Sequence, residues 1–293
     1  DMALANSSPR YTPLVQASLA NALIESGNTQ RARQLLGTLA QPKDASLAAQ
    51  LERSKARLLL AENKPDEARD AYLKLTTYKA GADAQYTRMW AWDGVARSQS
   101  ALGQKQAAAE ASTRALQDVD AVRAKFRSEE FKMGLFSDLQ SIFDRAISLY
   151  SDVGNAGQAL EVSERSRSRA LLDAVRGRAA LGRTEAAGSA DLASLQRALR
   201  SDERVVQFHS LPDRLQVWVV SPGEVKSQSI PIKRDELVEL VETFRNSVVR
   251  GRRNAIANAD KLGAGLIAPL GLAPGQRVVF VPHGPLHYLP FQA

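Results

Sequence analysis

Gly27-Asn28-Thr29-Gln30-Arg31-Ala32 is one of four related hexapeptides that decide the fold of this chain. In each of them, a residue that tolerates a tight turn is followed five positions later by alanine. The other three begin at Asn63, Gly103 and Gly154. Gly or Asn just past the end of a helix adopts the left-handed conformation at low cost, and alanine lets two helices cross closely. The pattern therefore predicts four helix–turn–helix units in series.

These units resemble tetratricopeptide repeats, which are stacked pairs of helices. The resemblance implies an α-helical solenoid over residues 1–178, with about four repeats and a long connecting helix at its end. The turns lie further apart than the family's period of about 34 residues, so we expect stretched repeats. Leu36, Tyr72 and Leu75 continue the apolar stripe of the second helices at helical spacing.

In such a solenoid, the first helix of each pair lines the concave surface. Three arginines in that groove would suit a carboxylate or an acidic segment of a protein partner. The alternative is that they are solvated helix charges that make local ion pairs. The repeat pattern places five polar residues in the groove: Asn21, Arg53, Arg57, Asp93 and Arg97.

The sequence of residues 161–178 predicts one long helix that continues the last repeat. Within it, Glu-Arg-Ser-Arg-Ser-Arg-Ala-Leu-Leu over residues 164–172 resembles the segment that leads from such repeats into a CHAT domain, a bacterial relative of caspases. Family members commonly have alanine where this chain has Ser168. Residues 179–191, rich in Ala and Gly, are predicted to be a linker. The motif residues implied by this resemblance are Glu164, Arg165, Arg167 and Arg169.

From residue 192 the sequence changes from helical patterns to alternating strand and helix patterns, which predicts an α/β domain over residues 192–293. Two β-branched runs on either side of a Leu-Pro-Asp-Arg turn indicate a hairpin, and Arg277–Val281 is a continuous apolar run typical of a strand buried on both faces of a parallel sheet. The remaining expected elements are a short helix at 192–200, hairpin strands at 205–209 and 215–220, an edge strand at 227–232, and helices at 235–250 and 261–270.

The final residues, 281–293, are very similar to the strand-and-loop motif of CHAT domains that ends in Leu-Pro-Phe-x-Ala. The resemblance implies that residues 192–293 are the N-terminal part of a caspase-like (CHAT) α/β domain. A sheet that stops here would have an open apolar edge, so we expect the remainder of the CHAT domain to cover it. The motif residues are Pro282, Gly284, Leu286, Pro290 and Phe291.

Proteolysis of this type needs a cysteine thiolate and a histidine, and this chain has no cysteine. The family places both residues in later segments, so the resemblance implies no catalytic residue here and an inactive chain in isolation. His283-Gly284 imitates the catalytic His-Gly, but its proline-rich surroundings match the earlier motif. His209 and His287 are interpreted as structural or hydrogen-bonded histidines.

The resemblance implies a bacterial protein, and the composition favours an arginine-rich soluble surface, with a net charge of +7 and 44% hydrophobic residues. No zinc spacing or phosphate-binding loop occurs, so we expect no metal and no cofactor. No stretch is apolar enough to span a membrane. Nucleic-acid binding is disfavoured because the basic residues of 165–178 do not share one helix face. A cytoplasmic location is expected, although a chain that opens on Asp1 leaves an upstream export signal open.

Two functions remain. In the first, the chain is the regulatory and structural front half of a caspase-like cysteine endopeptidase, and its repeats bind a protein partner or sensor. In the alternative, it is a non-catalytic repeat scaffold for protein–protein interaction with a degenerate CHAT domain. The difference lies in whether a parent chain carries the histidine and cysteine.

Overall fold

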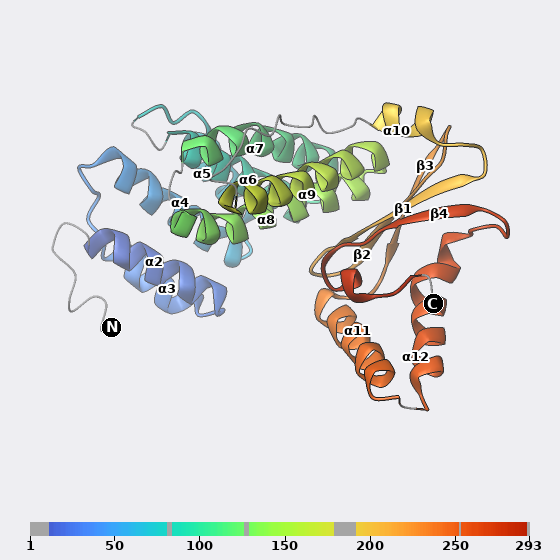
Figure 1. The fold of residues 1–293 in the computed structure, drawn as a ribbon. Helices are drawn as coiled ribbons and strands as arrows, with labels where there is room; N and C mark the ends of the chain where they lie inside the picture. The colour runs from blue at the N-terminus through green and yellow to red at the C-terminus, as the bar shows by residue number, and fades with distance from the viewer. Residues whose placement is uncertain (1–11, 81–83, 126–128, 179–191, 252, 292–293) are drawn as a thin grey trace. The chain divides into compact units, whose positions relative to one another are not determined.

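The computed structural model describes residues 12–80, 84–125, 129–178, 192–251 and 253–291. The chain divides into two compact units, Asp1–Val153 and Gly154–Ala293 (Figure 1). The sequence predicts a boundary after residue 178, whereas the long helix at 156–178 groups with the second compact unit. The predicted linker at 179–191 lies outside the described residues.

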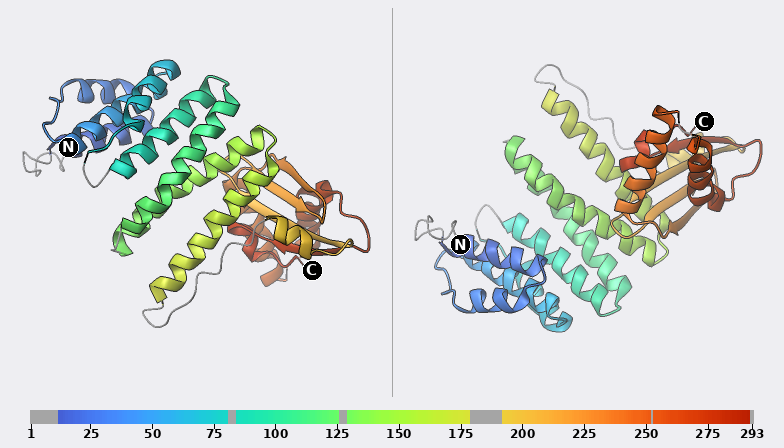
Figure 2. Two further views of the ribbon diagram at one scale, coloured as in Figure 1. Left: turned by 90° about the horizontal axis from the view of Figure 1, so that it is seen from above. Right: turned by 90° about the horizontal axis from the view of Figure 1, so that it is seen from below.

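The first unit is entirely helical in its described part. Each helix packs against the next one in the chain, and α2, α4 and α6 also pack one against another in that order (Figure 2). The helices are α2 (Thr12–Glu25), α3 (Thr29–Gly37), α4 (Ala45–Ala61), α5 (Pro65–Thr76), α6 (Ala84–Ala101), α7 (Lys105–Lys125) and α8 (Glu129–Asp152).

Short turns join α2 to α3, α4 to α5, and α6 to α7, with three residues in each. The turn residues predicted from the repeats, Gly27, Asn63, Gly103 and Gly154, all have a positive φ, as a left-handed helix end requires. The alanine five positions after each is 0% exposed, which confirms the close packing expected there. The helix–turn–helix pattern is therefore confirmed in its local geometry.

The second unit contains a four-stranded mixed sheet in the order β3-β2-β1-β4. The hairpin strands pair antiparallel as predicted, and β4 pairs parallel to β1. The strands are β1 (Glu203–Ser210), β2 (Leu215–Val220), β3 (Val225–Ile230) and β4 (Arg277–Val281). The helices are α9 (Ala156–Arg178), α10 (Leu192–Ala198), α11 (Arg234–Val249) and α12 (Ala255–Leu262), with short turns at Gly263–Ile267, Ala268–Leu270 and Gly284–Tyr288.

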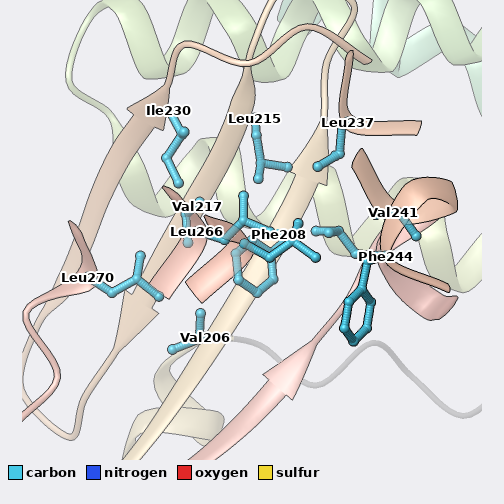
Figure 3. Close-up of a cluster of buried hydrophobic side chains, with 12 residues drawn as sticks. Val206, Phe208, Leu215, Val217, Ile230, Leu237, Val241, Phe244, Leu266 and Leu270 are labelled. Carbon is cyan, nitrogen blue, oxygen red and sulfur yellow. The ribbon is translucent and has the colours of Figure 1, made fainter. Parts of the chain in front are cut away.

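One face of this sheet forms the apolar core of the second unit. Alternate residues of β1 and β2, such as Phe208 and Val217, point to the same side as Leu237, Val241 and Phe244 of α11 (Figure 3). Because alternate side chains of a strand point to the same face, the period-two apolar pattern of this segment buries one face of the hairpin. The core therefore fixes the position of β1, which carries His209 on its other face.

Two expectations for this unit are wrong. The apolar run of β4 was expected to be buried on both faces, but β4 is the last strand of the sheet and Val279 is 56% exposed. The expected single helix at 261–270 begins earlier, at Ala255, and ends as a π turn followed by a 3-10 turn. Gly263 and Gly265 weaken the helix there, and Pro269 has no N–H to continue it.

No helix among the described residues combines the length and apolar character that a membrane crossing requires. The described residues also hold no cluster of three or more acidic, histidine or cysteine side chains suited to a metal ion.

Candidate binding pocket

A concave pocket of about 500 Å³ lies in the first unit. The first helix of each predicted pair, α2, α4, α6 and α8, contributes residues to it, together with Tyr72 of α5. All five residues that the sequence placed in the groove line this pocket: Asn21, Arg53, Arg57, Asp93 and Arg97.

Helical periodicity explains why these residues converge. Each of the four first helices presents two residues that are four positions apart, and such residues lie on the same helix face. The pairs are Asn21 and Glu25 on α2, Arg53 and Arg57 on α4, Asp93 and Arg97 on α6, and Ser141 and Arg145 on α8.

Two of the four arginines have a carboxylate partner. Arg145 Nε lies 2.7 Å from Asp93 Oδ1, and the Asp93 side chain is only 4% exposed. Arg57 Nη2 lies 2.6 Å from Glu25 Oε1, but the Glu25 side chain is 64% exposed. A carboxylate removed from water depends on its ion pair, whereas an exposed ion pair contributes little. The Arg145–Asp93 pair is therefore structural, and the Arg57–Glu25 pair can be replaced by another anion.

Aromatic rings form one wall of the pocket. The Arg53 guanidinium lies 5.5 Å from the ring centre of Tyr86 and 5.7 Å from that of Trp90, within cation–π range. Tyr86 and Trp90 contact each other edge to face. This wall holds Arg53 without neutralising its charge, and the described residues give Arg53 no carboxylate partner.

Arg97 is the most constrained charge in the pocket. Neither a hydrogen bond nor an ion pair joins its guanidinium to the described residues around it. Burial lowers the pKa of Arg97 below its usual value, and the nearby positive charge of Arg145 lowers it further, while Tyr72 and Asp93 act in the opposite direction. An arginine remains protonated even so. An anion beside Arg97 would relieve the unfavourable burial of its charge.

Tyr72 reaches the pocket because α6 has no side chain where the ring passes. A Cβ on Gly94 would lie 2.4 Å from the Tyr72 ring, closer than any real contact. Burial raises the pKa of the Tyr72 hydroxyl, and the positive charge of Arg97 partly opposes that effect. Gly94 therefore acts as a spacer that lets an aromatic ring from α5 lie beside Arg97.

Further buried polar atoms among the described pocket residues have no hydrogen-bond partner. They are Asn21 Oδ1, Arg57 Nε and Trp90 Nε1. Buried polar groups are nearly always hydrogen-bonded. Their presence beside unpaired guanidinium groups means that a polar ligand could satisfy several atoms of this pocket at once.

The predicted motif residues of α9 belong to the second unit and are not among the lining residues of this pocket. Arg167 Nη1 pairs with Glu164 Oε1 at 3.1 Å within one helix turn. Arg165 lies on the same helix, and the side chain of Arg169 is outside the described residues. These contacts are the local helix pairs expected of solvated charges.

The motif residues after β4 pack rather than present functional groups. Leu286 is fully buried in the core of the second unit, and the Phe291 ring stacks on Phe280 with centroids 4.8 Å apart. Gly284 begins a 3-10 turn with a positive φ. Pro282 precedes that turn, and Pro290 borders an apolar pocket beside Phe291.

A second polar cluster, which the sequence did not indicate, joins α9 to the sheet. His209 is fully buried, and its Nδ1 lies 2.9 Å from Ser163 Oγ. Gln207 Nε2 also donates to Ser163 Oγ. The His209 ring stacks on His283 with centroids 4.0 Å apart, and the Ser210 amide donates to His283 Nδ1. Because Ser163 is 0% exposed, this arrangement cannot present a nucleophile to a substrate.

The structural interpretation of His209 is thus confirmed, and His283 also has a structural role. His287, by contrast, is exposed and makes no hydrogen bond with the described residues, so its interpretation as a bonded histidine is wrong. It lies in the last turn of Gly284–Tyr288. Its position there orients the side chain toward solvent.

No protein-family model matches this chain, and a search of curated proteins also found no match.

Proposed function

We propose that the helical unit binds an acidic segment of a protein partner in the pocket formed by α2, α4, α6 and α8. The observation that carries this proposal is the charge of the pocket, where four arginines face two carboxylates. Arginine forks suit carboxylates and other oxyanions better than they suit neutral groups. The aromatic wall of Tyr86 and Trp90 offers apolar contact area to the rest of the segment.

A tetratricopeptide-like solenoid is the architecture proposed for this unit. Support comes from the three left-handed turns at Gly27, Asn63 and Gly103, the fully buried alanine that follows each of them, and the serial packing of the helices. In such an array the first helices line one concave surface. The proposal accounts for the fact that α2, α4, α6 and α8 all contribute to the pocket.

For the second unit, we propose an incomplete caspase-like domain of the CHAT type, whose parent is a cysteine endopeptidase. The mixed sheet, its parallel strand β4 and the packing of the loop after β4 support this assignment. The exposed edge of β4 and the exposed Val279 would be covered by further strands of that domain. Peptide hydrolysis by a thiolate would then need residues that this chain does not contain, because it has no cysteine.

The absence of cysteine equally favours a second candidate, a non-catalytic scaffold that works through the pocket alone. Both candidates share the partner-binding step. They differ in whether a polypeptide that carries a histidine and a cysteine completes the sheet at β4. Extended coding sequence that contains both residues would favour the peptidase, and its absence would favour the scaffold.

Fluorescence anisotropy with a labelled peptide tests the binding step. The peptide Gly-Ser-Asp-Glu-Asp-Glu-Gly should bind the wild-type chain, and its Asn/Gln counterpart should bind at least about tenfold more weakly. Arg57→Gln and Arg53→Gln should each weaken binding of the acidic peptide by about tenfold, since either removes a charge worth roughly 1.4 kcal/mol.

Arg114→Gln is the matched control for Arg53→Gln. Arg114 also stacks on a tryptophan, with its guanidinium 4.5 Å from the Trp92 ring centre, but it does not line the pocket. Its affinity should equal that of the wild type. Equal losses in Arg114→Gln and Arg53→Gln would mean that general surface charge, rather than the pocket, attracts the peptide.

A further inference from the structure

The charge balance of the pocket allows its ligand to be described more closely than as an acidic segment. This inference rests on the proposed function, since it concerns the same pocket. Four arginines and two carboxylates line it, which leaves two positive charges without a protein counterion. A ligand that matches the pocket therefore brings two negative charges into about 500 Å³.

The two unbalanced charges are assigned by the ion pairs. Asp93 neutralises Arg145 at 2.7 Å from a buried position. Arg53 contacts aromatic rings only, and the described residues offer Arg97 no counterion. Arg57 becomes a third donor when its exposed partner Glu25 turns toward water. Three guanidinium groups from two adjacent helices, α4 and α6, are thus available to one ligand.

A phosphate monoester fits three guanidinium groups better than a single carboxylate does. It carries a charge of about −1.5 to −2 at neutral pH and presents three strong acceptor oxygens, whereas a carboxylate carries one charge and two oxygens. Arginine is also the side chain best suited to bidentate contact with phosphate. Burial disfavours the charge of Arg97 and lowers its pKa, and two negative charges beside it offset that cost more than one does.

We propose that the pocket recognises a phosphorylated side chain of the partner, with the phosphoryl group between Arg53, Arg57 and Arg97. The Tyr86–Trp90 wall then contacts the peptide next to the phosphorylated residue. Phosphorylation of the partner would strengthen binding, because an unmodified serine leaves these guanidinium groups without a counterion.

The test compares four labelled peptides that differ at one place. Each is acetyl-Gly-Gly-X-Gly-Gly-amide, where X is phosphoserine, serine, aspartate or an Asp-Asp pair, so the ends carry no charge. We expect the phosphoserine peptide to bind at least about tenfold more tightly than the aspartate peptide. Arg97→Gln should remove that preference, while Arg114→Gln, outside the pocket, should keep it.

A pH series adds a readout specific to phosphate. The second ionisation of a phosphate monoester has a pKa of about 6. The affinity of the phosphoserine peptide should therefore fall between about pH 7.5 and 5.5. The affinity of the Asp-Asp peptide, which is fully ionised over that range, should stay the same. Inorganic phosphate should displace the phosphoserine peptide only in large excess.

The outcomes separate this inference from the proposed function. If the Asp-Asp peptide binds as tightly as the phosphoserine peptide, the inference is wrong and the proposed function stands. If no peptide of this set or of the earlier acidic pair binds, both are wrong. Inorganic phosphate as tight as the phosphopeptide would indicate a free anion as ligand and overturn the peptide proposal. A phosphoserine preference that survives Arg97→Gln would place the site elsewhere and also overturn it.

Discussion

Gly94→Ala should deform the pocket by displacing one ring. The added Cβ would lie 2.4–2.5 Å from three atoms of the Tyr72 ring, and the tyrosine is only 2% exposed. Overpacking of this kind costs about 1–3 kcal/mol. Replacing a mid-helix glycine by alanine returns about 0.5–1 kcal/mol. The net expectation is a destabilisation of about 1–2 kcal/mol.

Thermal unfolding followed by circular dichroism measures this change. For a unit of this size, 1 kcal/mol corresponds to a shift of about 2–4 °C, so the melting temperature should fall by about 2–8 °C. Gly37→Ala is the matched control, because nothing lies within 4 Å of its Cβ and α3 tolerates alanine. That variant should be unchanged or slightly more stable.

A double-mutant cycle isolates the contact. In a Tyr72→Leu background the clash with the ring disappears, so Gly94→Ala should cost at least about 1 kcal/mol less than in the wild type. If Gly94→Ala stabilises the protein as Gly37→Ala does, or costs the same in both backgrounds, the close approach of Tyr72 to α6 is wrong. The role of Gly94 as a spacer for the pocket would then be withdrawn.

Three other substitutions test the site and its surroundings. Asp93→Asn should lower stability by roughly 2 kcal/mol because Arg145 loses a charged hydrogen bond, and equal unfolding free energies in urea would contradict this. Burial raises the pKa of the Tyr72 hydroxyl in the folded chain. The stability that this shift contributes is fully present below the unfolded pKa of about 10, and it is lost as the pH rises through the higher folded pKa. Tyr72→Phe should therefore lose less stability than the wild type between about pH 9 and 11, and parallel pH profiles would refute the assignment. Ser163→Ala should cost about 1–3 kcal/mol, because His209 and Gln207 lose a buried partner, while peptide affinity stays unchanged; a stability equal to the wild type would argue against this cluster.

The groove residues could be predicted because their spacing is local. Residues four apart share a helix face whatever their tertiary surroundings, so the repeat pattern placed Arg53 and Arg57 correctly. Arg145 was missed although it is also four positions from a pocket residue, Ser141. Counting back from the turn at Gly154, the position equivalent to Arg53 and Asp93 is Asp144 rather than Arg145, so the repeat pattern does not indicate this arginine.

Other parts of the structure depend on contacts that local patterns do not encode. Ser163, His209 and His283 come from three separate elements, and only the assembled sheet brings them together. The apolar run of β4 predicted burial, but burial depends on what lies beside a strand, and no described strand lies beyond β4. Tyr86 and Trp90 had no signal as pocket residues because aromatic side chains on a helix are more often part of a core.

Nuclear magnetic resonance of the arginine side chains tests the central claim most directly. Nε–Hε signals would be assigned by single Arg→Lys variants and followed during titration with the acidic or phosphoserine peptide. The account predicts that the signals of Arg53, Arg57 and Arg97 shift together and saturate at one peptide per chain, while that of Arg114 stays in place. Shifts confined to arginines outside the pocket, with Arg97 unchanged at saturation, would contradict it.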